Sequence, residues 1–131
     1  MKSRYEGSQN LLWSMREGCY FLCLLSIAEE YLDEKVDLID SVRHCMDKGW
    51  LTNDYYVNDA CAILKWLCDV KDVRWKLVQS VGILKDNEYS LEKWKCGEKT
   101  HFRRRYFDVY ENSKTVKDGV RVGYYVFTII K

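Results

Sequence analysis

The sequence predicts an α+β fold, with three N-terminal helices packed on a C-terminal antiparallel sheet. The length of 131 residues is typical of one domain, here residues 1–131. A composition of 47% hydrophobic and 31% charged residues is that of a globular protein. Apolar residues recur at helical spacing up to about position 69 and alternate after it, which indicates helices followed by strands.

Three segments of the first half predict helices. Residues 19–32 are apolar on nearly every side, which is typical of a buried central helix. Residues 37–48 are amphipathic, and Gly49 follows them as a stop signal. Asn58 is the predicted N-cap of a third helix. Apolar side chains recur there at helical spacing: Ala60, Ile63, Leu64, Leu67 and Cys68.

Four segments of the second half predict strands. Residues 73–77 alternate with period two, and residues 89–95 form a second candidate. Residues 96–99 are short and polar enough for a hairpin turn that leads into a third strand, residues 100–107. Asp118 and Gly119 form a strong turn dipeptide before a last strand, Val120–Ile130, which is rich in β-branched and aromatic residues.

Charge and apolar runs limit the possible partners and compartments. The net charge is +1, so no global field favours nucleic acid or a membrane. Residues 1–50 contain 6 basic and 9 acidic residues, whereas residues 88–131 contain 10 basic and 6 acidic residues. The longest apolar run, residues 19–28, is too short to span a bilayer, and the first residues do not resemble a signal peptide. We therefore expect a cytoplasmic protein without a membrane partner.

The six cysteines do not predict a metal centre or a disulfide framework. They form no C-x-x-C pair, and the two histidines do not complete a zinc set with them. In the cytoplasm they would stay reduced. We expect Cys23, Cys45, Cys61 and Cys68 to be small buried apolar residues, and we expect neither a metal nor a cofactor.

Cys19 is the candidate for chemistry because it directly follows Gly18 at the start of the most buried predicted helix. A helix N-terminus has unpaired N–H groups and a partial positive charge. Such a site lowers the pKa of a thiol, makes the thiolate a nucleophile and can hold an oxyanion. The alternative is that Cys19 is a buried cysteine that begins a helix by chance.

This cysteine and the order of the elements resemble the papain-like thiol-peptidase fold. The stretch from Gln9 to Cys19 looks like the cysteine block of compact bacterial members of that fold. The stretch of residues 108–119, which begins with Asp108, looks like the end of a small family carried by phages and other mobile elements. The resemblance implies an oxyanion role for Gln9, although its spacing to Cys19 is longer than in papain-type peptidases.

In papain-type peptidases a histidine on one strand is the base, and an Asp or Asn on the next strand orients it. If residues 96–99 are the hairpin turn, the position expected for this histidine, 18 residues before Asp108, is Ser90. A serine cannot take a proton from a thiol near neutral pH, so this register predicts a degenerate site. A second register makes Cys19 and His101 the dyad, with Asp118 or Asn112 as the orienting residue.

Basic residues crowd the same predicted hairpin, and aromatic residues lie between them. The candidate binding residues are Lys93, Lys95, Lys99, Arg103, Arg104 and Arg105. Such a pattern can contact phosphates and stack bases, or it can bind an acidic protein surface. Strand alternation directs Arg103 and Arg105 to one face and Arg104 to the other. The alternative is an edge hairpin that its charges protect from aggregation.

The leading prediction is a catalytically degenerate papain-like protein of phage or mobile-element type. It would bind a host macromolecule, with a host protein preferred, through the basic aromatic hairpin, a role compatible with interference with host defence. Two alternatives remain. One is an active thiol peptidase or amidase that uses a Cys-His dyad, and the other is a small nucleic-acid-binding module.

Overall fold

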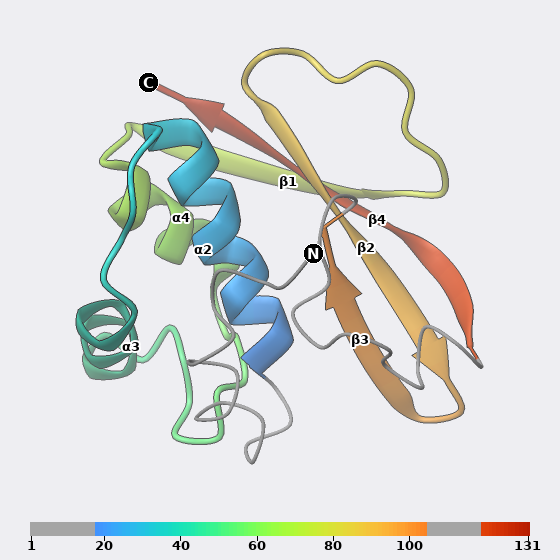
Figure 1. Ribbon diagram of the computed structural model, residues 1–131, viewed down its shortest axis with the longest axis horizontal. Coiled ribbons are helices and arrows are strands. Elements are labelled where there is room, and N and C mark those ends of the chain that lie inside the picture. The colour runs from blue at the N-terminus through green and yellow to red at the C-terminus, as the bar shows by residue number, and fades with distance from the viewer. Residues whose placement is uncertain (1–17, 105–118) are drawn as a thin grey trace.

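The computed structural model describes residues 18–104 and 119–131, and in this part it confirms the α+β class (Figure 1). Three helices precede four strands in the described residues. The helices are α2 (Gly18–Leu32), α3 (Leu38–Asp47) and α4 (Ala60–Cys68), and the strands are β1 (Asp72–Val78), β2 (Glu88–Cys96), β3 (Lys99–Arg103) and β4 (Val120–Ile130).

Helix α2 is the centre of the helical layer, as its composition predicts. It begins at Gly18, one residue earlier than expected, and all its residues as far as Glu29 are buried except Tyr20, which is partly buried. A helix that is apolar all round must be covered on several sides. In the structure α2 packs against α4 and β3, and Figure 1 shows it between α4 and the β2–β3 part of the sheet.

The other two helices begin at aspartate caps. Asp37, predicted as the first residue of this helix, is the N-cap of α3, whose first helical residue is Leu38. The N-cap of α4 is Asp59, whose Oδ1 accepts a hydrogen bond from the backbone N–H of Ala62 at 3.0 Å. The prediction of Asn58 as this cap is wrong. The Asn58 amide instead donates to the carbonyl oxygen of Gly49 at 3.1 Å, which ties the segment before α4 to the end of α3.

The four strands form one antiparallel sheet in the order β1-β4-β2-β3. Strand β4 has the predicted bounds and lies between β1 and β2. Cys96 pairs with Lys99, so the predicted hairpin turn and its register are confirmed. The predicted strand of residues 100–107 begins at Lys99 instead, and residues 105–107 lie outside the described part.

The sheet has two faces with different neighbours. One face, called the helix face below, packs Val73, Leu91, Phe127 and Ile129 into a single core with α2 and α4. The opposite face is called the far face. Val126 lies on it, because successive residues of a strand point to opposite sides, and Val126 is buried without belonging to that core.

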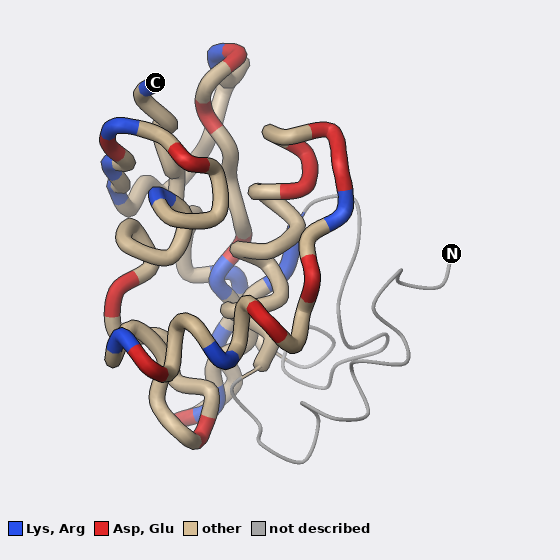
Figure 2. Tube along the Cα trace, turned by 90° about the vertical axis from the view of Figure 1, so that its left-hand side faces the viewer, with Lys and Arg blue, Asp and Glu red and all other residues tan. Residues whose placement is uncertain are grey.

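Charge is spread unevenly over the fold (Figure 2). The end of α2, the segment after it and the first turn of α3 carry acidic residues that are exposed: Glu30, Asp33, Glu34, Asp37 and Asp40. The tip of the β2–β3 hairpin carries the exposed Lys95 and Lys99. No helix in the described ranges combines the length and the apolar character needed to cross a membrane.

Candidate functional site

Cys19 lies in the first turn of α2, as expected, but it is buried and has almost no contact with solvent. Only 3% of the residue is exposed, and it belongs to the apolar core. A nucleophile that attacks a macromolecular substrate must be reached by that substrate. The burial therefore favours the interpretation of Cys19 as a core cysteine.

Aromatic side chains occupy the helix face of the sheet beside this first turn. The Tyr20 ring stacks on Phe102 of β3 with centroids 4.3 Å apart, and it lies 5.8 Å from the Tyr125 ring of β4. Lys93 of β2 donates a hydrogen bond to the Tyr125 hydroxyl at 3.2 Å. Burial raises the pKa of Tyr20 strongly, so its phenol stays protonated. The groups that the sheet presents to this turn are thus two aromatic rings and an ammonium.

His101 is buried in β3 and lies directly opposite Trp94 of β2. Neighbouring residues of a strand point to opposite faces, and Phe102 points to the helix face. His101 therefore belongs to the far face, on the other side of the sheet from Cys19. The dyad stays a prediction that this alternation does not favour, and Asp118 and Asn112 lie outside the described residues.

Only part of the predicted degenerate site, Cys19 and Ser90, lies in the described residues. Ser90 of β2 pairs with Val126 of β4, which also assigns Ser90 to the far face. Gln9 and Asp108 lie outside the described residues. Neither register is therefore complete in the described part of the chain, and both remain predictions.

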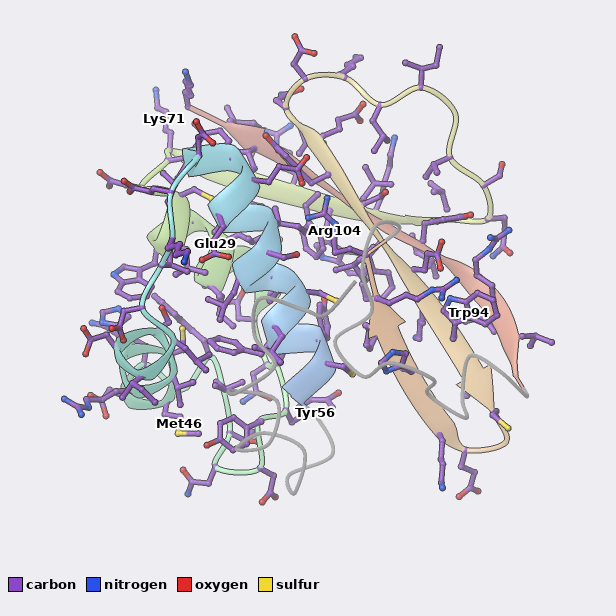
Figure 3. All side chains as sticks on the ribbon, viewed as in Figure 1. Glu29, Met46, Tyr56, Lys71, Trp94 and Arg104 are labelled. Carbon is purple, nitrogen blue, oxygen red and sulfur yellow. The ribbon has the colours of Figure 1, made fainter. Side chains whose placement is uncertain are left out.

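The far face carries a compact cluster of charged and aromatic side chains. Two rows of paired residues cross β4, β2 and β3, and together they form what is called the far-face cluster: Tyr124, Glu92 and Arg103 in one row, and Arg121, Trp94 and His101 in the other. Directly paired residues share a face and lie close enough to interact. Figure 3 shows Trp94 far from the helices, near the hairpin end of β2.

The carboxylate of Glu92 links two members of this cluster, Arg103 and Trp94. Glu92 Oε1 accepts hydrogen bonds from Arg103 Nε at 2.7 Å and from Trp94 Nε1 at 2.8 Å. The Arg103 guanidinium lies 4.9 Å from the centre of the Trp94 ring, and the Arg121 guanidinium lies 4.8 Å from that of Tyr124. Both guanidinium groups are therefore held on aromatic rings, an arrangement that suits recognition of carboxylates or phosphates.

The candidate binding residues of the hairpin have separate roles. Arg104 is buried, and its Nη2 contacts Glu30 Oε2 at 2.7 Å while its Nη1 donates to Ser26 Oγ at 3.3 Å. Figure 3 shows Arg104 between α2 and the sheet. Arg104 and Arg103 thus point to opposite faces, as alternation predicts.

Of the remaining basic residues, Lys93 is half-buried on the helix face, where it bonds Tyr125. Lys95 and Lys99 are exposed at the hairpin tip. Arg105 lies outside the described residues. Two of the predicted binding residues are therefore exposed cations, whereas Lys93 and Arg104 make contacts within the fold.

Sequence reasoning missed three members of the far-face cluster. Glu92, Tyr124 and Arg121 were not candidates. The signal for Glu92 was available, because the hairpin turn at residues 96–99 already sets it opposite Arg103. The position of Tyr124 depends on the pairing of β2 with β4, and that of Arg121 depends in addition on a register shift between Lys93 and Trp94, which no sequence pattern predicts.

The other cysteines behave mostly as predicted. Cys23, Cys45 and Cys68 are buried, whereas Cys61 is half-buried. Burial raises the pKa of the Cys45, Cys61 and Cys68 thiols to about 11, so these thiols are protonated at neutral pH. They are therefore poor nucleophiles and poor metal ligands.

Comparison with known proteins adds a family but no activity. No curated protein and no solved structure matches the chain. One family, described as "Protein of unknown function, DUF261", matches residues 4–125 and therefore nearly the whole sequence. The chain belongs to this family.

Proposed function

We propose that the protein is a catalytically degenerate, papain-like protein of mobile-element type that binds a host protein through the β2–β3 hairpin. The observation that carries this proposal is which side chains of β3 point toward the helices. Its side chain toward the first turn of α2 is Phe102, so alternation turns the imidazole of His101 away from Cys19. The burial of Cys19 and this orientation of His101 do not support peptide hydrolysis.

The charge of the hairpin supports binding rather than catalysis. Lys95 and Lys99 are exposed at the tip, and Arg121 is exposed beside them at the start of β4. Arg103 is partly exposed and keeps its guanidinium on the Trp94 ring. A surface of this kind steers and orients an acidic partner, and interference with host defence is the role that we propose for it.

The first test measures the reactivity of the thiol. Native protein is treated with iodoacetamide at pH 6, and each cysteine is quantified by peptide mass spectrometry. We expect Cys19 to react no faster than a free cysteine, because it is buried and because strand alternation turns His101 away from it. Protein unfolded in urea is the control for accessibility. Fast labelling of Cys19, with an amidase activity lost in Cys19→Ala, would establish the peptidase alternative and overturn the proposal.

The second test measures binding in a nuclease-treated lysate of a bacterial host. We expect one protein to be retained by the wild type and by Cys19→Ala, and to be lost from Lys95→Glu/Lys99→Glu. Lys65→Glu/Lys85→Glu is the matched control, because these lysines are exposed outside the hairpin. Retention by the hairpin variant contradicts the proposal. Binding to single-stranded DNA that falls steeply with salt would favour the nucleic-acid alternative instead.

A further inference from the structure

Strand β1 is an edge of the sheet with an unusual distribution of side chains. Its neighbour in the described part of the chain is β4, on one side. On the helix face, Trp75 is 54% exposed and Leu77 is 50% exposed. On the far face, Arg74 and Lys76 are also exposed, and Arg74 Nε contacts Asp72 Oδ2 at the start of the strand at 3.3 Å. The strand therefore presents apolar side chains on one face and cations on the other.

The pairing with β4 determines which backbone N–H and C=O groups of β1 point away from the sheet. In an antiparallel pair, alternate residues turn their N–H and C=O groups toward a given neighbour. The N–H of Ile129 donates to the carbonyl oxygen of Asn87, on the side of β2. The even-numbered residues of β4 consequently turn their backbone N–H and C=O groups toward β1. Each even-numbered residue of β4 is paired with an even-numbered residue of β1, so the even-numbered residues of β1 make the backbone hydrogen bonds to β4. Trp75 and Leu77 then direct their N–H and C=O groups away from the sheet.

The start of β1 shows the same direction. The N–H of Val73 is bonded by Oδ1 of its neighbour Asp72 at 2.9 Å rather than by β4. The Asp72 side chain thereby occupies the first N–H group of β1 that points away from the sheet. Trp75 and Leu77 remain as two consecutive outward-facing positions at which another strand can pair.

We propose that β1 binds an extended segment of a partner protein in which apolar and acidic residues alternate. Such a segment would add to the edge as a fifth strand and bond the outward groups of Trp75 and Leu77. Its apolar side chains would lie beside these two residues on the helix face. Its acidic side chains would lie beside Arg74 and Lys76, where unlike charges on neighbouring strands attract.

The same charges disfavour a second copy of the chain as the occupant. Antiparallel pairing of two β1 strands brings Arg74 and Lys76 of both copies to one face, and like charges across a strand pair are destabilising. The β1 edge is also separate from the proposed hairpin surface. Strands β1 and β3 are opposite edges of the sheet, so the two surfaces can be disrupted independently.

A fluorescein-labelled dodecapeptide of alternating valine and glutamate tests the proposal by fluorescence anisotropy. We expect it to bind the wild-type protein at least about tenfold more tightly than two control peptides. One control alternates valine and lysine, and the other has six valines followed by six glutamates. Arg74→Glu/Lys76→Glu should reverse the preference in favour of the lysine peptide.

Backbone pairing is tested by Leu77→Pro, which removes an outward N–H and leaves the bonds to β4 in place. We expect its affinity for the peptide to fall at least about tenfold, with far-ultraviolet circular dichroism as the check on folding. If this variant does not fold, the charge reversal decides, because it keeps the backbone unchanged. Lys95→Glu/Lys99→Glu should bind the peptide like the wild type, which separates this inference from the hairpin proposal.

Three outcomes would overturn the inference. One is no binding of the alternating peptide, or equal binding of the valine–glutamate block peptide. A second is an affinity that the Arg74→Glu/Lys76→Glu reversal does not change. The third is self-association of the wild type in size-exclusion chromatography that Leu77→Pro abolishes, since this would make a second copy the occupant.

Discussion

The two faces of the sheet differ in what holds their side chains. On the helix face, Leu91 and Phe127 are fully buried in the core shared with α2. On the far face, Glu92 makes hydrogen bonds to Arg103 and Trp94 instead. Burial of apolar area stabilises the first face, whereas charge-assisted hydrogen bonds and ring contacts organise the second.

The hairpin shows what this difference means for reading a charged sequence. Arg103 and Arg104 are adjacent in the chain, yet Arg103 contacts Glu92 on the far face and Arg104 contacts Glu30 of α2. Strand alternation has divided a basic run between a surface cluster and a structural link. A run of cations in a strand therefore does not amount to one basic patch.

The largest expected difference between the faces comes from deleting a core ring. Phe127→Ala should lower the free energy of unfolding by about 4 kcal/mol, because it removes a fully buried ring and leaves a cavity. Thr128→Ala, the neighbouring change toward the far face, should cost less than about 1 kcal/mol. Urea denaturation followed by circular dichroism measures both. Equal losses would mean that the far face is packed as a second core.

The ion pair that joins β3 to α2 should give a smaller effect. Arg104 has 9% of its side chain exposed, and its partner Glu30 has 54% exposed. Glu30→Gln leaves a buried guanidinium without its counter-charge and should cost about 2 kcal/mol. Arg104→Met removes the buried charge itself and should cost less. If Arg104→Met is the more damaging change in urea denaturation, the pair stabilises the fold by more than it costs in desolvation.

Much of the fold could be predicted because local signals agreed with tertiary packing. Residues 37–48 contain both caps of α3, and β4 has the predicted bounds. The cap of α4 was misplaced because Asn58 and Asp59 are both good N-caps. Which of them caps the helix depends on the hydrogen bond from Asn58 to Gly49, a contact nine residues away in the chain.

The candidate site was less predictable for a different reason. A helix N-terminus marks Cys19 as special, but burial by distant segments determines whether its thiol can be reached. The face of His101 follows from the parity of β3, which the contacts of Phe102 with Tyr20 and of Arg104 with Glu30 fix relative to α2. Shifting such an assignment by one residue transfers every side chain to the other face.

The helical layer should also show a pH dependence. The pKa of Cys45 and of Cys68 is raised by burial from 9.0 to about 11. Above pH 9 these thiols ionise in the unfolded chain and stay protonated in the folded one, so stability should fall between pH 9 and pH 11. At pH 10, each thiol should lower the free energy of unfolding by about 1 kcal/mol relative to its value at neutral pH.

This pH dependence can be assigned with one variant. In reducing buffer, Cys45→Val keeps a buried apolar side chain of similar size and should lose less stability than the wild type between pH 8 and pH 10. Cys96→Ser is the matched control, because Cys96 is half-buried at the hairpin tip. A loss in Cys45→Val as steep as in the wild type would show that Cys45 already ionises in the folded protein.

The smallest effect is expected on the far face, where the contacts are partly exposed. Arg103→Lys keeps the charge but removes the guanidinium contact with the Trp94 ring and the Nε hydrogen bond to Glu92, and it should cost about 1 kcal/mol. Lys95→Arg, an exposed change on the same hairpin, should be neutral within about 0.5 kcal/mol. Urea denaturation at 0.05 M and 0.5 M NaCl separates two contributions, because salt screens an exposed ion pair and leaves ring contact in place. A cost of Arg103→Lys that disappears in high salt would mean that the ring contributes nothing to the far-face cluster.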